Sequence, residues 1–299
     1  MKYIVILLLA FSLLSFDNKS TEKQNEETKT IVSGEVEELQ GGFRFTEGPA
    51  VDAQGNVYFS DIPQHLIFIW TLDNELDTFR LESGSSNGLY FDKDENLLAC
   101  EGAKGRITLT STSGDYRAIA QEYDGARFNQ TNDLWPDPKG GVYFTDPRYG
   151  GAKGELPQDG MHVYYISPNH KSVMRVCDDF EKPNGILGTP DGKTLYVTDA
   201  QAKKTYQYTI EADGSLSNKS LFVNVGCDGM TLDQEGNVYL TTSGKNAVDI
   251  FSPEGQLLES IPVPQRPSNV CFGGKERNQL FITARTSLYR ITLNAMGVD

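Results

Sequence analysis

The stretch Asn132-Asp-Leu-Trp-Pro-Asp137-Pro-Lys-Gly140-Gly-Val142-Tyr-Phe-Thr carries the pattern from which the fold can be predicted. A polar anchor residue, Asn132, is followed by a short apolar segment, by Asp five residues on and by Gly eight residues on. A second segment of β-branched and aromatic residues comes next. Asp and Gly favour turns, whereas β-branched and aromatic residues favour strands. The stretch therefore predicts two antiparallel strands joined by a tight turn.

A polar anchor followed by two apolar segments occurs six times along the chain, at intervals of 40 to 52 residues, with the Asp present in four repeats and the Gly in four. The anchors are Glu47, Asn87, Asn132, Asn184, Asp228 and Asn269. A period of this length with several strands per repeat is typical of propeller blades. The last repeat is about one strand short, and residues 36–45 have no hairpin partner nearby. We therefore predict an all-β, six-bladed β-propeller whose N-terminal strand joins the C-terminal blade and closes the ring, with an open β-sandwich as the alternative.

The N-terminal segment has the pattern of an export signal. Lys2 precedes an apolar run from residue 3 to residue 16, which is shorter than the roughly 18 residues that a membrane span needs. We expect residues 1–16 to be a signal peptide, 17–30 a flexible tether and 31–299 the folded domain. The protein would then be exported, to a bacterial periplasm or to the medium, with no stable membrane span after signal removal. A retained anchor helix is the alternative.

Composition excludes several classes of function. The chain has 299 residues, with 27 Lys and Arg against 41 Asp and Glu, a net charge of −14 that disfavours a nucleic-acid partner. We expect a monomer. Three His and no Gly-x-Ser-x-Gly motif disfavour a His-rich zinc site and a serine triad.

Cys100 and Cys271 lie in apolar strand patterns, whereas Cys177 and Cys227 lie near neighbouring anchors and could pair in an oxidising compartment.

The anchors also suggest a chemistry. In a propeller, equivalent residues of the innermost strands converge on one mouth of the central channel. All six anchors are carboxylate or amide side chains, the oxygen donors that suit a hard cation such as Ca²⁺. Asn or Asp before Gly is also an ordinary turn residue, which is the competing interpretation. A second set of acids 14 or 15 residues after an anchor should rim the mouth or cap the strand ends: Asp61, Glu101, Asp146 and Asp199.

Several longer motifs resemble the family of gluconolactonases, regucalcin and related lactonases. They are the stretch at 123–135 (YDGARFNQTNDLW), the stretch at 143–150 (YFTDPRYG), and the shorter motifs at 46–49 (TEGP), 182–185 (KPNG) and 227–230 (CDGM). The resemblance implies one divalent metal ion, most often Ca²⁺, with Mg²⁺, Mn²⁺ and Zn²⁺ as alternatives. It implies Glu47, Asn184 and Asp228 as ligands and Asn132 as a fourth ligand or a substrate contact. Gln130 stands where some members have an Arg that binds substrate.

The resemblance also implies hydrolysis of a sugar lactone. The ion would polarise the carbonyl, and Asp228 would activate water or attack directly. Substrate contacts are expected from Asn132, Asp146 and Tyr149. The alternatives are a phosphotriesterase or arylesterase at the same metal, a propeller related to strictosidine synthase that works without such a metal, and a non-catalytic propeller that binds a sugar or a protein.

Overall fold

The structure is a computed structural model that describes Met1 and residues 30–149 and 154–298. The folded unit begins at Ile31. The signal peptide expected at 1–16 and the tether expected at 17–30 fall, but for their end residues, outside the described part of the chain. Within that part, no helix is long and apolar enough to cross a membrane. The helix that it does contain is one short 3₁₀ turn, η1 (Ile62–Gln64).

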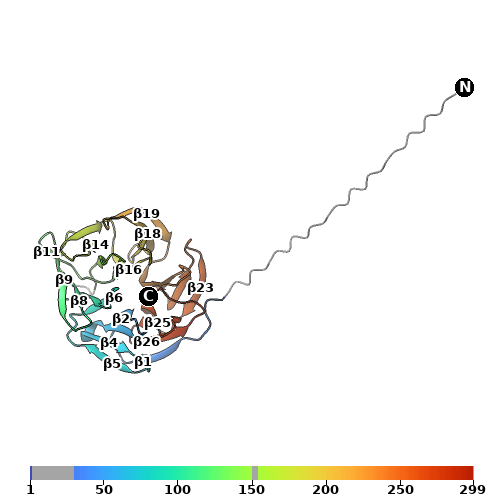
Figure 1. Cartoon of the computed structure of the whole chain (residues 1–299), viewed down its shortest axis with the longest axis horizontal. Coiled ribbons are helices and arrows are strands. Elements are labelled where there is room, and N and C mark those ends of the chain that lie inside the picture. The colour runs from blue at the N-terminus through green and yellow to red at the C-terminus, as the bar shows by residue number, and fades with distance from the viewer. Residues whose placement is uncertain (2–29, 150–153, 299) are drawn as a thin grey trace. The chain divides into compact units, whose positions relative to one another are not determined.

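Six four-stranded antiparallel sheets surround a central axis as the blades of a β-propeller, as Figure 1 shows. The prediction of an all-β, six-bladed propeller is confirmed. From the innermost strand outward the blades are β2 (Thr46–Val51), β3 (Val57–Asp61), β4 (Leu66–Trp70), β5 (Leu76–Arg80); β6 (Ser86–Phe91), β7 (Leu97–Glu101), β8 (Arg106–Thr110), β9 (Tyr116–Ala120); β12 (Leu134–Pro136), β13 (Val142–Asp146), β14 (His162–Ile166), β15 (Val173–Cys177); β16 (Pro183–Gly188), β17 (Thr194–Asp199), β18 (Lys204–Ile210), β19 (Leu216–Val223); β20 (Cys227–Leu232), β21 (Val238–Thr242), β22 (Ala247–Phe251), β23 (Leu257–Pro262); and β24 (Pro267–Gly273), β25 (Gln279–Ala284), β26 (Ser287–Thr292), β1 (Glu37–Gly41).

The ring is closed by the strand nearest the N-terminus, as predicted. β1 pairs antiparallel with β26 and forms the outer edge of the sixth blade, with Glu37 opposite Arg290 and Gly41 opposite Ser287. The strand is shorter than the expected span of residues 36–45. The innermost strands pack on one another in a closed circle, in the order β2, β6, β12, β16, β20, β24 and back to β2. Between the second and third blades lies a short extra hairpin of β10 (Glu122–Tyr123) and β11 (Ala126–Arg127).

The repeated Asp and Gly form the turn between the first two strands of a blade. In the third blade, Asp137 Oδ1 accepts hydrogen bonds from the backbone N–H groups of Lys139 (2.8 Å) and Gly141 (2.9 Å). Gly140 has a φ of 90°, a conformation that costs glycine little because it has no Cβ. The Asp and Gly found five and eight residues after an anchor therefore mark the position of this turn in the blade.

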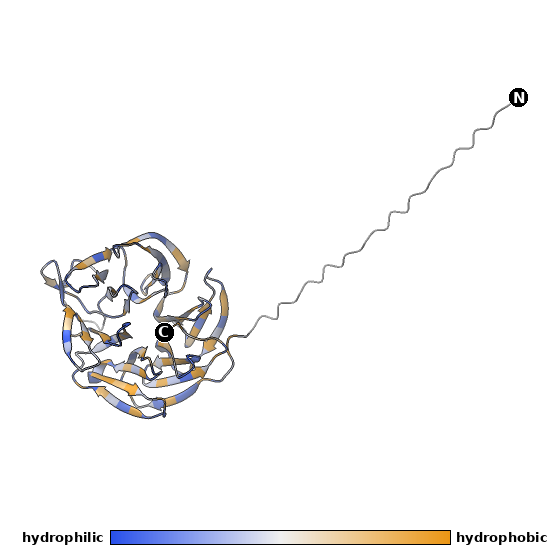
Figure 2. Cartoon of the chain, in the orientation of Figure 1, coloured by the Kyte–Doolittle hydropathy of each residue, from blue (hydrophilic) through white to orange (hydrophobic). Residues whose placement is uncertain are grey.

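The core lies between the blades rather than at one centre. Figure 2 shows hydrophobic and hydrophilic residues alternating along the strands, so that each sheet presents apolar side chains to its neighbours. The largest fully buried side chains include Tyr143, Tyr164, Tyr239 and Tyr289. Cys177 and Cys227 belong to one apolar cluster, but like the other two cysteines they are free thiols, so the pairing considered above is not formed.

Candidate active site

Five of the six anchors lie at irregularities near the start of an innermost strand, whereas Asn132 lies just before β12. In the first blade the pairing register shifts between Glu47 and Ala50, and the same irregularity occurs at the anchors of the second, fourth and fifth blades. A bulge re-aims side chains, here toward the channel. The Gly after the anchor allows the next blade to approach, because a Cβ on Gly48 would lie 2.1 Å from the carbonyl oxygen of Asn87.

Hydroxyl side chains of the second strand hold these bulges in place. Thr241 Oγ1 accepts the backbone N–H of Gly229 (2.8 Å), and Thr283 Oγ1 accepts that of Asn269 (3.1 Å). Sequence analysis missed this set, although a signal for it exists: a hydroxyl residue lies 13 or 14 positions after five of the six anchors. The five residues are Ser60, Thr145, Thr198, Thr241 and Thr283.

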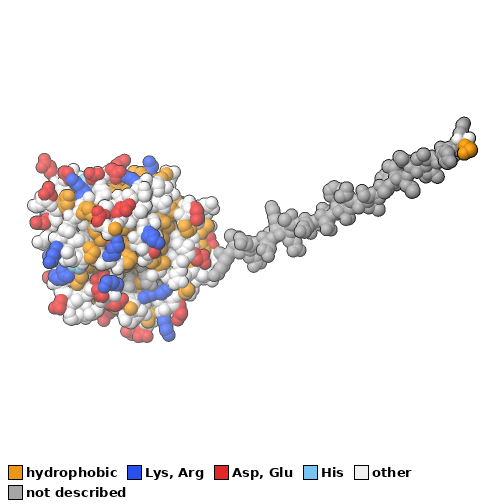
Figure 3. Space-filling view, turned by 45° about the horizontal axis from the view of Figure 1, so that its top comes forward, with side chains coloured by type: hydrophobic (Ala, Val, Ile, Leu, Met, Phe, Trp, Pro, Cys, Tyr) orange, Lys and Arg blue, Asp and Glu red, His pale blue; other side chains and the backbone are white. Residues whose placement is uncertain are grey.

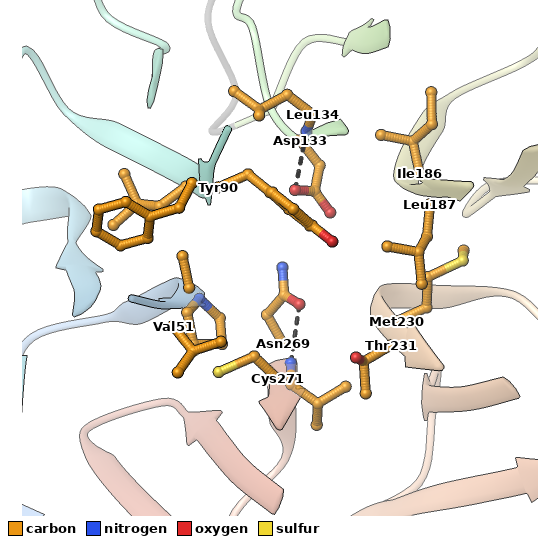
Figure 4. Close-up of a pocket in the computed structure, with 15 residues that line it drawn as sticks. Val51, Tyr90, Asp133, Leu134, Ile186, Leu187, Met230, Thr231, Asn269 and Cys271 are labelled. Atoms are coloured by element: carbon orange, nitrogen blue, oxygen red, sulfur yellow. Dashed lines mark hydrogen bonds between the residues drawn. The ribbon is translucent and has the colours of Figure 1, made fainter. Parts of the chain in front are cut away.

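Below the mouth, side chains from all six blades converge on the channel, as Figure 4 shows. Most are apolar, but Asp133 and Asn269 reach toward the centre. Burial raises the pKa of Asp133 to about 7, although hydrogen bonds from the Leu134 N–H and the Asn269 side chain favour its charged form. Asp133 was not singled out from sequence. The signal was there, because it is the only acidic residue directly after an anchor, where four repeats have Gly.

Two carboxylates at the channel mouth, Glu47 and Asp228, lie near enough to affect each other electrostatically. Glu47 is 4% exposed, and burial together with the negative charge of Asp228 raises its pKa well above 4.5. Burial also raises the pKa of Asp228, to about 6, although the Asn184 side chain and the charges of Arg266 and Arg285 oppose the shift. One buried and one half-buried acid, both with a raised pKa, indicate a site where a bound cation would be favoured.

A chain of three hydrogen bonds sets the orientation of Asn184. Its Nδ2 donates to Asp228 Oδ1 (2.6 Å) and to the Tyr149 hydroxyl (2.7 Å), so its Oδ1 is the atom left to accept or to coordinate. Tyr149 is in turn fixed by its backbone N–H, which donates to Gln130 Oε1 (2.7 Å). Burial first, and then the charge of Asp228, raise the pKa of the Tyr149 phenol, so it stays protonated at neutral pH. Because the Tyr149 oxygen accepts from Asn184, its own proton is free for another acceptor.

These groups open onto a pocket of about 310 Å³. A cavity of that size can admit a small sugar derivative. Its described lining consists of Tyr149, Lys182, Asn184, Ala200, Gln201, Lys203, Cys227, Asp228, Ser243, Gly244 and Arg266. The pocket thus contains Asn184, Asp228 and Tyr149 of the predicted site, and Glu47 lies beside it through its interaction with Asp228.

Asp146 lies apart from this pocket. It is fully buried, and its two carboxylate oxygens accept the backbone N–H groups of Asn129 and Gln130, each at 2.8 Å. Asp61 and Asp199 hold the loops before β2 and β16 in the same way. This geometry favours strand-end capping over the substrate contact expected for Asp146. Asp146 contributes to the site indirectly, because it holds the backbone of Gln130, whose side chain accepts the Tyr149 N–H.

Asn132 is held at the mouth by its backbone. Its N–H donates to the Thr145 carbonyl (2.9 Å), and its carbonyl accepts the Gly88 N–H (2.8 Å). The side chain is 6% exposed. In the described residues no group of three or more His, Cys, Asp and Glu side chains could hold a metal ion. A metal site here would therefore combine the two acids with amide oxygens, a mixture that suits Ca²⁺ better than Zn²⁺.

The known proteins similar to this chain include several lactonases. Residues 45–286 match the family model described as the SMP-30/gluconolactonase/LRE-like region. A gluconolactonase of Zymomonas mobilis is 29% identical, over 89% of this chain and 83% of that protein, and the lactonase drp35 of Staphylococcus saprophyticus is 28% identical, over 74% and 70%. The solved structure of a gluconolactonase from Xanthomonas campestris superimposes with a TM-score of 0.81, at 28% identity over 88% of this chain and 91% of that one. A calcium-binding regucalcin from Agrobacterium tumefaciens, at 20% identity over 89% and 95% and a TM-score of 0.75, shares the fold.

Proposed function

The chain belongs to the SMP-30/gluconolactonase/LRE-like family, and on that premise we propose that it is a metal-dependent hydrolase that opens a sugar lactone. The observation that supports this most directly is the pair of acids, buried Glu47 and half-buried Asp228, at the pocket that Asp228 lines at the channel mouth. The names of two relatives, a gluconolactonase and a lactonase, agree with it.

The donor set fits a divalent cation, most readily Ca²⁺. Glu47 and Asp228 would supply negative charge, and the Oδ1 atom of Asn184 is oriented by the two bonds of its Nδ2. Asn132 is the candidate for a fourth oxygen. Burial disfavours the charged form of both carboxylates, and the charge of Asp228 adds to this for Glu47, a cost that a bound cation would remove. When bound, the ion would act as a Lewis acid toward the lactone carbonyl and the oxyanion formed there.

The chain's own groups would handle the proton. Asp228 is half-buried and opens onto the pocket, where its carboxylate can take a proton from the attacking water. The water oxygen bonds to the carbonyl carbon, the ring C–O bond breaks, and the leaving oxygen receives a proton to give the hydroxy acid. The Tyr149 hydroxyl would donate a hydrogen bond to a substrate oxygen. Gln130 and Asn184 hold that hydroxyl in place.

A pH-stat assay on several aldonolactones, with and without chelator, tests the proposal. We expect hydrolysis by the purified protein that chelation abolishes and Ca²⁺, Mg²⁺, Mn²⁺ or Zn²⁺ restores. Asp228→Asn keeps the shape and an oxygen donor but removes the base, so activity at saturating metal should fall at least about 10²-fold. Asp94→Asn, a change of the same kind at an exposed residue paired with Lys93, is the matched control.

Each other outcome points elsewhere. Hydrolysis of aryl esters or phosphotriesters but of no lactone would replace the proposed substrate class. No hydrolysis with any of the four metals would make the chain a binding propeller. Activity that survives complete chelation would remove the metal from the mechanism.

A further inference from the structure

The mouth pocket has a charge opposite to that of the chain. The sequence has 41 acidic and 27 basic side chains, and Figure 3 shows both kinds interspersed over the face that it presents. The described lining of the mouth pocket, however, holds three cations, Lys182, Lys203 and Arg266, and one carboxylate, Asp228. The positive charge of Arg285 also acts on Asp228 and lowers the pKa of its carboxyl group. Even when Glu47 beside the pocket is counted with Asp228, cations outnumber carboxylates at this rim, although the protein as a whole is acidic.

These cations come from separate loops, and none of them lies within ion-pair distance of a carboxylate among the described residues. Lys182 immediately precedes β16, Lys203 lies between β17 and β18, and Arg266 immediately precedes β24. Lys182 instead has its Nζ 5.0 Å from the ring centroid of Tyr149, which places a positive charge beside a pocket-lining phenol.

Cations around a pocket that are not paired with carboxylates attract anions. We propose that the substrate is a lactone that carries an additional anionic group, a carboxylate or a phosphate, held by Lys182, Lys203 and Arg266. This inference rests on the proposed function and specifies its substrate class. The lactone carbonyl would lie toward Asp228 and Asn184, with the anionic group toward the rim.

Matched pairs of lactones test the inference. D-Glucono-1,4-lactone and D-glucaro-1,4-lactone differ in a hydroxymethyl against a carboxylate at C6, and D-glucono-1,5-lactone can be compared with its 6-phosphate. One charge-assisted hydrogen bond of ordinary strength corresponds to about tenfold or more in affinity. We therefore expect at least one anionic lactone to exceed its neutral counterpart in kcat/KM by about tenfold or more at low salt. The excess should shrink toward 1 M salt, where the Debye length falls to about 3 Å.

The variant Lys203→Gln/Arg266→Gln should reduce this anionic-to-neutral ratio at least about fivefold, because two of the three cations are gone. Lys171→Gln, a neutralised exposed lysine that does not line the mouth pocket, should leave the ratio unchanged. If the parent prefers the neutral member of both pairs, the inference is wrong. The inference is also wrong if the double variant lowers kcat/KM equally for the anionic and the neutral lactone, because the rim cations then act only on the ionisation of Asp228.

Calorimetry with the open-chain acids separates this inference from the proposed function. If no lactone is hydrolysed, the proposed function fails, but binding of gluconate, glucarate and 6-phosphogluconate still tests the rim. Tighter binding of glucarate or 6-phosphogluconate by about tenfold, lost in the double variant, supports an anion-binding rim. Equal binding of all three acids overturns it. The carboxylate and phosphate arms show which anion is preferred.

Discussion

Removing the hydroxyl of Tyr149 should weaken catalysis with little effect on the fold. In Tyr149→Phe, Asn184 Nδ2 loses its 2.7 Å acceptor but keeps Asp228 Oδ1, so the orientation of the amide is weakened rather than abolished. A net hydrogen bond is worth about 1 kcal/mol, and losing a donor to a substrate oxygen adds about 1–2 kcal/mol. The sum, about 2–3 kcal/mol, corresponds to a fall in kcat/KM of about 30- to 150-fold.

The assay is initial-rate lactone hydrolysis in a pH-stat at saturating Ca²⁺, with urea unfolding of the same samples. Tyr165→Phe is the matched control, because it removes a phenol that donates to Asp137 Oδ2 (2.8 Å) in the turn between β12 and β13. It should cost about 1 kcal/mol of stability and leave kcat/KM unchanged. If Tyr149→Phe keeps kcat/KM within about threefold of the parent, the hydroxyl has no part in the site, and the argument from Asn184 fails.

Four further changes test other parts of the structure. Gln130→Ala should lower kcat/KM in the same direction as Tyr149→Phe but less, because the phenol remains; equal rates in variant and parent would separate Gln130 from the site. Asp146→Asn replaces one of two acceptors of backbone N–H groups and should cost about 1–3 kcal/mol in urea unfolding, whereas an unchanged midpoint would deny its capping role. Gly229→Ala would place a Cβ 1.9 Å from Asn269 Oδ1, so a markedly lower Tm is expected, and a parent-like Tm would show that the channel can relax. Burial raises the pKa of Glu101, but hydrogen bonds from a tyrosine and two arginines outweigh burial and lower the pKa below 4.5. The stabilising effect of this carboxylate should therefore be present above about pH 4.5 and be lost on acidification. Glu101→Gln should cost about 3 kcal/mol of stability near pH 7 and progressively less below pH 4.5.

Most of the fold could be predicted because it repeats. A single Asp-Gly turn such as that of Asp137 and Gly140 is weak evidence, but its recurrence at a nearly constant interval identifies the blade and its number. The closing strand followed from counting, since the sixth repeat lacked one strand. The exact ends of β1 did not follow, because pairing with β26 decides where that strand begins and ends.

The candidate site could be predicted only in part. Glu47, Asn184 and Asp228 share an anchor position, so their convergence follows from the ring. The roles of Asp146 and Gln130 depend on the path of the loop before β12, which brings backbone N–H groups to a carboxylate 16 and 17 residues away. No periodic pattern encodes such a path. The channel position of Asp133 arises from a local substitution for Gly, which repeat analysis treats as a deviation.

Closure by β1 has a consequence for how the chain reaches its final state. Glu37 and Arg290, joined across the closing strand pair, are 253 residues apart in sequence, so this contact joins nearly the first and nearly the last folded residues. Bringing such distant segments together carries a large loop-closure entropy and is a slow, non-local step. A nascent or truncated chain without β26 leaves β1 unpaired and the sixth sheet incomplete, with exposed edges prone to pair between molecules. The ring can therefore close only in a chain that extends through β26.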